Sequence, residues 1–184
     1  LSQWRDHPPG WRSENAAPLV IIRQATDADF DAIWPIFHQI VSAGDSYAYP
    51  PDTNQTQARH LWMAVPAATY VVEQDGQILG TYYIKANQQG PGAHVCNCGY
   101  MVARAARGQG LASAMCEHSQ KIAMEMGFSA MQFNFVASTN QGAIRLWEKL
   151  GFATVGRLPK AFKHPVEGNV DALVMYKWLV QESP

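Results

Sequence analysis

The spacing of hydrophobic residues alternates along the chain between a period of two, typical of strands, and a period of three to four, typical of helices. Apolar residues at helical spacing predict an amphipathic helix from Phe30 to Val41, in which Pro35 is tolerated near the first turns or at a kink. Asp75-Gly76 lies between two β-rich runs and is the strongest short signal of a hairpin. The predicted elements are a strand at 19–23, helices at 30–41 and 56–65, strands at 69–73, 77–85 and 93–102, a helix at 111–126, a strand at 131–136, a helix at 140–150, and strands at 152–158 and 170–179.

This order predicts an α+β fold whose central part alternates strand and helix, with a basic loop at 159–169 between the last two strands. The length of 184 residues and the hydrophobic content of 47% fit one globular domain, expected at 19–180. The segment 1–18 contains prolines, no periodic pattern and no apolar stretch that resembles a secretory signal. We therefore expect it to be a flexible N-terminal extension.

Charge and cysteine content narrow the possible partners. The net charge of −1 argues against an extended nucleic-acid-binding face or an anionic membrane surface. No apolar run approaches the roughly 18 residues that a membrane-spanning helix needs. Three cysteines are an odd number, which does not fit a disulfide framework and favours a reducing compartment. We expect a cytoplasmic protein without a nucleic-acid or membrane partner.

The segment Arg107-Gly108-Gln109-Gly110-Leu111-Ala112 joins a predicted strand to a predicted helix. Two glycines allow a tight turn, and the unpaired N–H groups and the positive dipole end of the helix form an anion site beside Arg107. A phosphate or pyrophosphate is the expected ligand, and an ordinary strand-to-helix turn is the alternative. The segment lacks the third glycine of the dinucleotide fingerprint and the Lys-Ser/Thr of a Walker loop.

A second block starts at Asn140 and reads Asn-Gln-Gly-Ala-Ile-Arg-Leu-Trp-Glu-Lys-Leu-Gly-Phe, ending at Phe152. Together the two blocks resemble motifs of the GCN5-related N-acetyltransferases, Gln/Arg-x-x-Gly-x-Gly/Ala and Asn-x-x-Ala-x-x-Leu-Tyr-x-Lys-x-Gly-Phe. The resemblance covers about 19–179 and departs from the second motif at Trp147, where the family has Tyr. It implies a twisted, mostly antiparallel sheet flanked by about four helices, with the parallel strands 93–102 and 131–136 splayed around acetyl-CoA.

The resemblance also implies how acetyl-CoA would be held. Its pyrophosphate would lie on the amides of the glycine-rich turn, its pantetheine arm would pair with the backbone near Met101 and Val102, and Asn140 would reach the pantetheine amide or the adenosine side. Asn140 as an ordinary helix N-cap is the alternative. The implied cofactor-binding residues are Met101, Val102, Arg107, Gly108, Gln109, Gly110, Leu111, Ala112 and Asn140.

No metal is expected. His94, Cys96 and Cys98 share one strand face, but residues two apart on a strand lie roughly 6.5–7 Å apart, which is wider than zinc ligands prefer.

Acetyl transfer to an amine needs a route for the amine proton, donors for the thioester oxygen and protonation of the leaving thiolate. An indole N–H donates a hydrogen bond but supplies no proton, so Trp147 does not replace the family's Tyr as an acid; core packing is its alternative role. Strand 93–102 has no carboxylate where the family often has Glu. Deprotonation would then run through water, Tyr100 or His94.

Asn97 and Asn134 are polar residues within apolar strands and are the candidate catalytic residues. They could face each other across the gap and orient the amine, hold a water or donate to the oxyanion; satisfying backbone groups where the strands separate is the alternative. Asparagines in such places also give a fainter resemblance to N-acetyltransferases of proline-like imino acids.

The resemblance implies that the acceptor enters between the loop after the first helix and the loop before the last strand. Tyr47, Tyr49 and Phe162 offer aromatic walls there, with Asp45 nearby and basic residues that suit a carboxylate. The expected acceptor is therefore the amine of a small molecule, such as an amino or imino acid. An acetyl-CoA sensor without turnover and a protein N-terminal acetyltransferase are the alternatives, and a homodimer is expected by resemblance only.

Overall fold

The computed structural model describes residues 20–180, so the predicted extension at 1–18 lies outside the described residues. The helices and strands are β1 (Val20–Gln24), α1 (Phe30–Ala43), α2 (Gln55–Arg59), a π-helical turn (His60–Ala64), β2 (Ala68–Gln74), β3 (Gln77–Ala86), β4 (Val95–Val102), α3 (Leu111–Glu125), β5 (Ala130–Ala137), α4 (Gln141–Lys149), β6 (Ala153–His164) and β7 (Gly168–Trp178). Short 3₁₀ turns at Asp27–Asp29, Gly90–Gly92 and Arg104–Ala106 complete the list. The described part thus has the predicted α+β order of elements.

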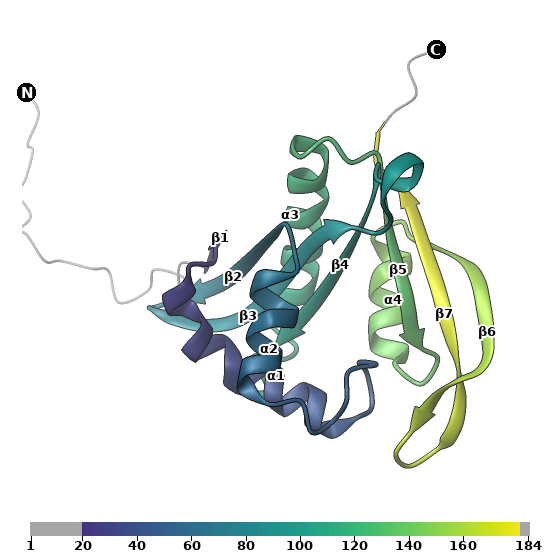
Figure 1. Ribbon diagram of the computed structural model, residues 1–184, viewed down its shortest axis with the longest axis horizontal. Coiled ribbons are helices and arrows are strands. Elements are labelled where there is room, and N and C mark those ends of the chain that lie inside the picture. The colour runs from purple at the N-terminus through teal and green to yellow at the C-terminus, as the bar shows by residue number, and fades with distance from the viewer. Residues whose placement is uncertain (1–19, 181–184) are drawn as a thin grey trace, which may run out of the picture.

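The seven strands form one sheet in the order β1-β2-β3-β4-β5-β7-β6, in which every neighbouring pair is antiparallel except β4 and β5. Helices cover both faces (Figure 1). The apolar face of α1 and the buried Trp62 pack against β2, β3 and β4, whereas α3 and α4 pack with β4, β5 and β7 around Trp147. This confirms the predicted sheet with one central parallel pair and helices on either side.

The parallel pairing of β4 with β5 is short. Only Val95 with Ala130 and Cys96 with Met131 are paired, after which the two strands diverge toward the lower edge of the sheet in Figure 1. The register of β5 against β7 shifts between Phe133 and Val136, so β5 follows β7 away from β4. The sheet therefore contains the splayed pair that the resemblance implied.

The predicted basic loop at 159–169 is wrong for its first half. β6 continues to His164, and a short turn joins it to β7. The register shifts between Leu158 and Phe162, and the Asp171 carboxylate on β7 accepts bonds from the backbone N–H of Lys160 (2.9 Å) and from the Arg157 guanidinium (2.7 Å). This bulge interrupts the strand alternation, which is why the sequence resembled a loop.

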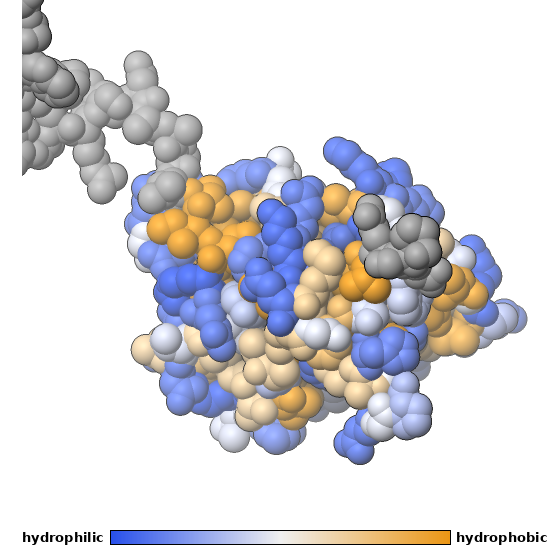
Figure 2. All heavy atoms as spheres, turned by 90° about the horizontal axis from the view of Figure 1, so that it is seen from above, coloured by the Kyte–Doolittle hydropathy of each residue, from blue (hydrophilic) through white to orange (hydrophobic). Residues whose placement is uncertain are grey.

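Seen from above, orange patches lie among hydrophilic residues (Figure 2). Val20, Ile21 and Trp178 are among the exposed large hydrophobic residues. Within residues 20–180 no helix is both long and apolar enough to cross a bilayer.

Candidate active site

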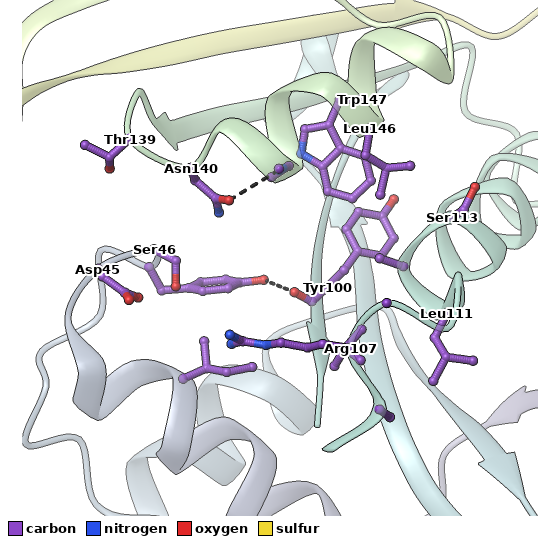
Figure 3. A pocket seen from close by; sticks show the side chains of 18 of the residues that line it. Asp45, Ser46, Tyr100, Arg107, Leu111, Ser113, Thr139, Asn140, Leu146 and Trp147 are labelled. Carbon is purple, nitrogen blue, oxygen red and sulfur yellow. Dashed lines mark hydrogen bonds between the residues drawn. The ribbon is translucent and has the colours of Figure 1, made fainter. Parts of the chain in front are cut away.

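A cavity of about 730 Å³ lies where β4 and β5 diverge (Figure 3). Its walls come from five places in the chain: the segment after α1, the end of β4, the β4–α3 turn with the start of α3, the start of α4, and the β6–β7 turn. Two helix N-termini and an open strand edge thus face one space. An anionic, extended ligand suits such a wall.

The β4–α3 turn forms the end of the cavity at which the sequence predicted an anion site. Gly108 and Gly110 have φ of +80° and +79°, which glycine adopts without strain, while a Cβ at either would meet no neighbour. Glycine is needed there for its backbone conformation. Gly110 caps α3 without a side-chain bond, so the first N–H groups of α3 stay open to the cavity. The exposed Arg107 side chain points into the same space and makes no ion pair within residues 20–180.

The open edge of β4 follows from the ladder with β3. Ala103 N–H donates to Leu79 O and Asn87 N–H donates to Val95 O, both 2.8 Å. Because hydrogen-bonded pairs alternate along an antiparallel ladder, the odd-numbered residues of β4 pair with β3, and Tyr100 and Val102 direct their backbone groups toward β5.

The two residues predicted to contact the pantetheine arm, Met101 and Val102, face opposite neighbours of β4. Val102 lines the cavity and offers backbone groups to it. Met101 does not line the cavity: its backbone faces β3, and its side chain is buried against the α1 side of the sheet. Tyr100, which the resemblance did not single out for this role, takes the place of Met101 on the open edge.

Tyr47 reaches that edge from the segment after α1. Its hydroxyl donates a 2.9 Å bond to Tyr100 O, which Figure 3 draws as a dashed line ending at Tyr100. Its ring stacks on Tyr49 with centroids 5.7 Å apart. Burial raises the pKa of Tyr47 well above its ordinary value, so the hydroxyl keeps its proton and acts as a donor. Tyr49 does not line the cavity and stacks against Phe37.

Tyr100 and Trp147 form the wall next to the open edge. The Tyr100 hydroxyl lies 2.7 Å from Ser119 Oγ on α3, and burial raises its pKa well above the ordinary value. The Trp147 ring packs on Tyr100 (5.1 Å) and Phe133 (5.0 Å) and is 8% exposed. Its indole N–H donates to no residue within 20–180. The side chain therefore packs in the core and also presents an unbonded donor at the cavity wall.

The start of α4 completes this side. Asn140 Oδ1 accepts a bond from Ala143 N–H at 3.3 Å, which makes Asn140 the N-cap of α4 while its amide group lines the cavity. Thr139 also lines the cavity, and its Oγ1 is a buried oxygen without a hydrogen-bond partner among the described residues. Polar groups of the chain are therefore available here for a ligand.

Residues 30–152 match the model of the Acetyltransferase (GNAT) family. The chain belongs to the GNAT acetyltransferase family. Both blocks that carried the resemblance line one cavity, as Arg107–Ala112 forms the β4–α3 turn and the second block begins α4.

Known relatives agree with this membership. The GNAT acetyltransferase is similar to a GCN5-related N-acetyltransferase from Kribbella flavida, with 45% identity, a TM-score of 0.83, and coverage of 87% of this chain and 98% of that one. It is 35% identical over 108 residues to N-acetyltransferase aca1 of Schizosaccharomyces pombe, covering 58% of this chain and 52% of that protein, so the chain spans about half the length of this curated relative. The structure of yncA from Salmonella typhimurium with its cofactor acetyl-CoA shares the fold, with 21% identity, a TM-score of 0.76, and coverage of 90% and 97%.

Two residues of the GNAT acetyltransferase that the sequence reasoning did not assign, His164 and Glu167, line the cavity from the β6–β7 turn. His164 Nδ1 accepts bonds from the backbone N–H groups of Val166 (3.2 Å) and Glu167 (3.1 Å). Because Nδ1 accepts these bonds, Nε2 carries the ring proton and presents a donor. A prediction of one continuous strand over 153–164 would have been needed to place His164 at this part of the cavity wall.

Of the predicted catalytic and acceptor residues, Tyr47 lines the cavity, whereas Asn97, Asn134, Tyr49 and Phe162 do not. Asn97 is buried and donates to Gln132 O, whereas Asn134 is exposed and donates to Asn87 Oδ1 (2.6 Å). They do not hydrogen-bond to each other. Phe162 is buried against Phe135 on β5. Gln109 of the β4–α3 turn is exposed and likewise does not line the cavity.

The arginine and lysine residues of β6 do not line the cavity either. Arg157 and the backbone of Lys160 are bound to Asp171, and Lys163 is exposed. The charged side chains that do line the cavity are Asp45, Arg107 and Glu167. The expected basic wall for a carboxylate is thus replaced by two carboxylates, one arginine and the His164 donor.

Proposed function

We propose that this chain is an acetyl-CoA-dependent N-acetyltransferase that acetylates the amine of a small molecule by direct attack on the thioester. The observation that carries the proposal is the cavity between the open edge of β4 and the N-terminus of α3, with Arg107 beside it. GNAT membership and the solved relative with acetyl-CoA support it.

The residues present fit acetyl-CoA. The N–H groups of Gly110, Leu111 and Ala112 with Arg107 would hold its pyrophosphate, and the backbone of Tyr100 and Val102 would hold its pantetheine arm. Asn140 and Thr139 offer further polar groups at the start of α4. When bound, acetyl-CoA supplies an activated acetyl group and a thiolate leaving group.

The residues of the chain then handle charge and protons. Asp45 and Glu167 are the carboxylates of the cavity wall and attract a protonated amine; either accepts its proton directly or through water. His164 is a donor in this geometry, and His94 lies outside the cavity wall, with Nδ1 3.1 Å from Pro91 O. Trp147 N–H stabilises negative charge on the leaving sulfur without protonating it.

An amino or imino acid as the acceptor stays a prediction, as do the homodimer, the cytoplasmic location, and the roles of Asn97, Asn134, Tyr49 and Phe162. The amine of an amino or imino acid would meet Asp45 and Glu167, and its carboxylate would meet the His164 Nε2–H or Arg107. Peptide or polyamine acceptors would instead use the two carboxylates alone.

Thiol release from acetyl-CoA against a panel of amino acids, imino acids, polyamines and short peptides tests the proposal. Turnover on one amine class supports it and names the acceptor. Tight binding of acetyl-CoA without turnover on any acceptor contradicts it and supports a sensor. Preferred turnover on peptides supports a protein N-terminal acetyltransferase.

A further inference from the structure

The point where β4 and β5 part is occupied by the side chain of Asn97. The parallel ladder ends at Cys96 and Met131, and in a continued ladder the N–H of Cys98 would donate to Gln132 O. Gln132 O instead accepts a 2.9 Å bond from Asn97 Nδ2. A side-chain amide thus takes the place of the next backbone rung and leaves the N–H of Cys98 facing the gap.

The other end of the Asn97 side chain is also bound. The hydroxyl of Tyr83 on β3 donates a 2.9 Å bond to Asn97 Oδ1, and both residues are 7% exposed. Burial raises the pKa of Tyr83 well above its ordinary value, so the hydroxyl remains a donor. Because the Gln132 carbonyl oxygen can only accept, the NH₂ group of Asn97 must face it, which leaves Oδ1 to accept from the Tyr83 hydroxyl. The relay therefore crosses three strands in one direction.

Space for this relay comes from Gly99. A Cβ at Gly99 would lie 2.6 Å from Cε1 of Tyr83, closer than two carbons can approach. On its other side the Tyr83 ring meets Trp62 edge-on at 4.9 Å. The ring is thus held between the backbone of β4 and the π-helical turn, with its hydroxyl aimed at Asn97.

We propose that Asn97 is a positioning residue that sets where β4 and β5 separate and so keeps the edge of Tyr100 and Val102 open for the acetyl-CoA arm. The inference rests on the proposed function for its ligand, and on the described geometry for the strand separation. Without the Asn97 amide, Gln132 O is either a buried acceptor without a donor or takes the N–H of Cys98. The second outcome extends the ladder into the gap.

The first test replaces the donor without changing the shape. Asn97→Asp puts a carboxylate oxygen against Gln132 O, and two acceptors repel each other. At about pH 8 we expect the Kd for acetyl-CoA, measured by calorimetry, to rise about tenfold or more. The unfavourable acceptor and burial raise the pKa of the new carboxyl; below that pKa the protonated group donates again, and affinity recovers as the pH falls.

A matched control and a second variant keep the test decisive. Asn169→Asp makes the same change at an exposed position of β7 and should leave the Kd unchanged at every pH. Tyr83→Phe removes the hydroxyl that orients the Asn97 amide and should weaken binding about threefold. Unchanged affinity in both Asn97→Asp and Tyr83→Phe, or a loss in Asn97→Asp that ignores pH, overturns the proposal.

Amide hydrogen exchange tests the strand separation without acetyl-CoA. In Asn97→Ala we expect the N–H of Cys98 to become protected, because it takes over Gln132 O, whereas in the unaltered chain it exchanges readily. A protected Cys98 N–H in the unaltered chain overturns the inference. Failure of the unaltered chain to bind acetyl-CoA, together with the expected exchange pattern, overturns the proposed function and leaves the strand-separating role supported.

Discussion

The hydroxyl of Tyr47 donates a 2.9 Å hydrogen bond to the carbonyl oxygen of Tyr100, on the edge of β4 that faces the cavity. A backbone carbonyl on an open strand edge is the acceptor that an extended ligand would use. The chain thus satisfies this carbonyl with its own side chain, from a segment 53 residues away. Tyr47 and the acetyl-CoA arm would compete for one acceptor.

Removing the Tyr47 hydroxyl should tighten the binding of acetyl-CoA. Tyr47→Phe keeps the ring stacked on Tyr49 but removes the donor, so we expect the Kd for acetyl-CoA to fall about threefold, equivalent to a net hydrogen bond of about 0.7 kcal/mol. Calorimetry measures it. Tyr176→Phe, a hydroxyl outside the cavity, is the control and should bind as the unaltered chain does. Weaker binding by Tyr47→Phe would mean that the hydroxyl helps to hold the ligand.

Arg107 should contribute to acetyl-CoA binding through charge. Its guanidinium lines the cavity beside the α3 N-terminus and has no ion-pair partner within residues 20–180. We expect Arg107→Gln to raise the Kd for acetyl-CoA about tenfold, since a hydrogen bond to a charged group contributes about 1.5–3 kcal/mol. The effect should shrink as salt concentration rises. Arg104→Gln makes the same charge change at an exposed position outside the cavity; an equal effect there would mean that only net charge matters.

The glycine turn and the start of α3 could be predicted from the sequence because they are local. The glycines at 108 and 110 and the helix that follows are neighbours in the chain, and the backbone conformation they need is a property of glycine itself. Asn140 as a helix cap follows for the same reason.

The part of the cavity wall formed by the end of β6 and the β6–β7 turn could not be predicted, because it depends on pairings between distant residues. Asp171 holds the bulge at Lys160 that carries β6 on to His164, and no local pattern signals that bond. Asn97 was recognisable as an unusual polar residue in a strand. Its partners Tyr83 and Gln132 come from two other strands, so its role depends on the assembled sheet.

Two glycines at helix starts should respond oppositely to the same substitution. Gly110 has φ of +79°, which strains any other residue, so Gly110→Ala should lower the free energy of unfolding by about 1 kcal/mol. Gly142 lies within α4, and a Cβ there meets nothing within 4 Å. Gly142→Ala should therefore raise the free energy of unfolding by about 0.5–1 kcal/mol. Urea denaturation measures both. Equal effects would contradict the backbone argument.

Acid should weaken the bond network at the start of α1. The Asp29 carboxylate accepts bonds from the Arg23 guanidinium (2.8 and 2.9 Å) and from Thr26 N–H (2.7 Å), and the bonds from Arg23 above all hold the pKa of Asp29 well below its usual range. Because the pKa is lower in the folded state, this stabilisation is present above the unfolded pKa of about 3.9 and is lost as the pH falls through the folded value.

Asp29→Asn should therefore cost about 1 kcal/mol at neutral pH, a value discounted because Arg23 is more than a third exposed. The difference from the unaltered chain should shrink as the pH falls below about 4. Denaturant unfolding across this pH range measures it, with the exposed Asp31→Asn as the control. A difference that stays constant with pH would contradict the assignment to the Asp29 carboxylate.

We expect the Trp147 indole to stabilise the leaving sulfur of acetyl-CoA. The indole packs on Tyr100 and lines the cavity, and its N–H has no acceptor within residues 20–180. Trp147→Phe keeps an aromatic ring but removes this donor, so we expect kcat to fall about tenfold, as for the loss of one hydrogen bond to developing charge, with little change in the KM for acetyl-CoA.

Trp147→Tyr separates donation from proton transfer. A tyrosine hydroxyl restores a donor and adds a titratable proton, so kcat should recover and its pH profile should gain an alkaline limb near the hydroxyl's pKa. Thermal unfolding of both variants shows whether the core stays intact around Phe133. If kcat of Trp147→Phe equals that of the unaltered chain, the indole serves packing alone, and the departing sulfur relies on backbone donors of β4.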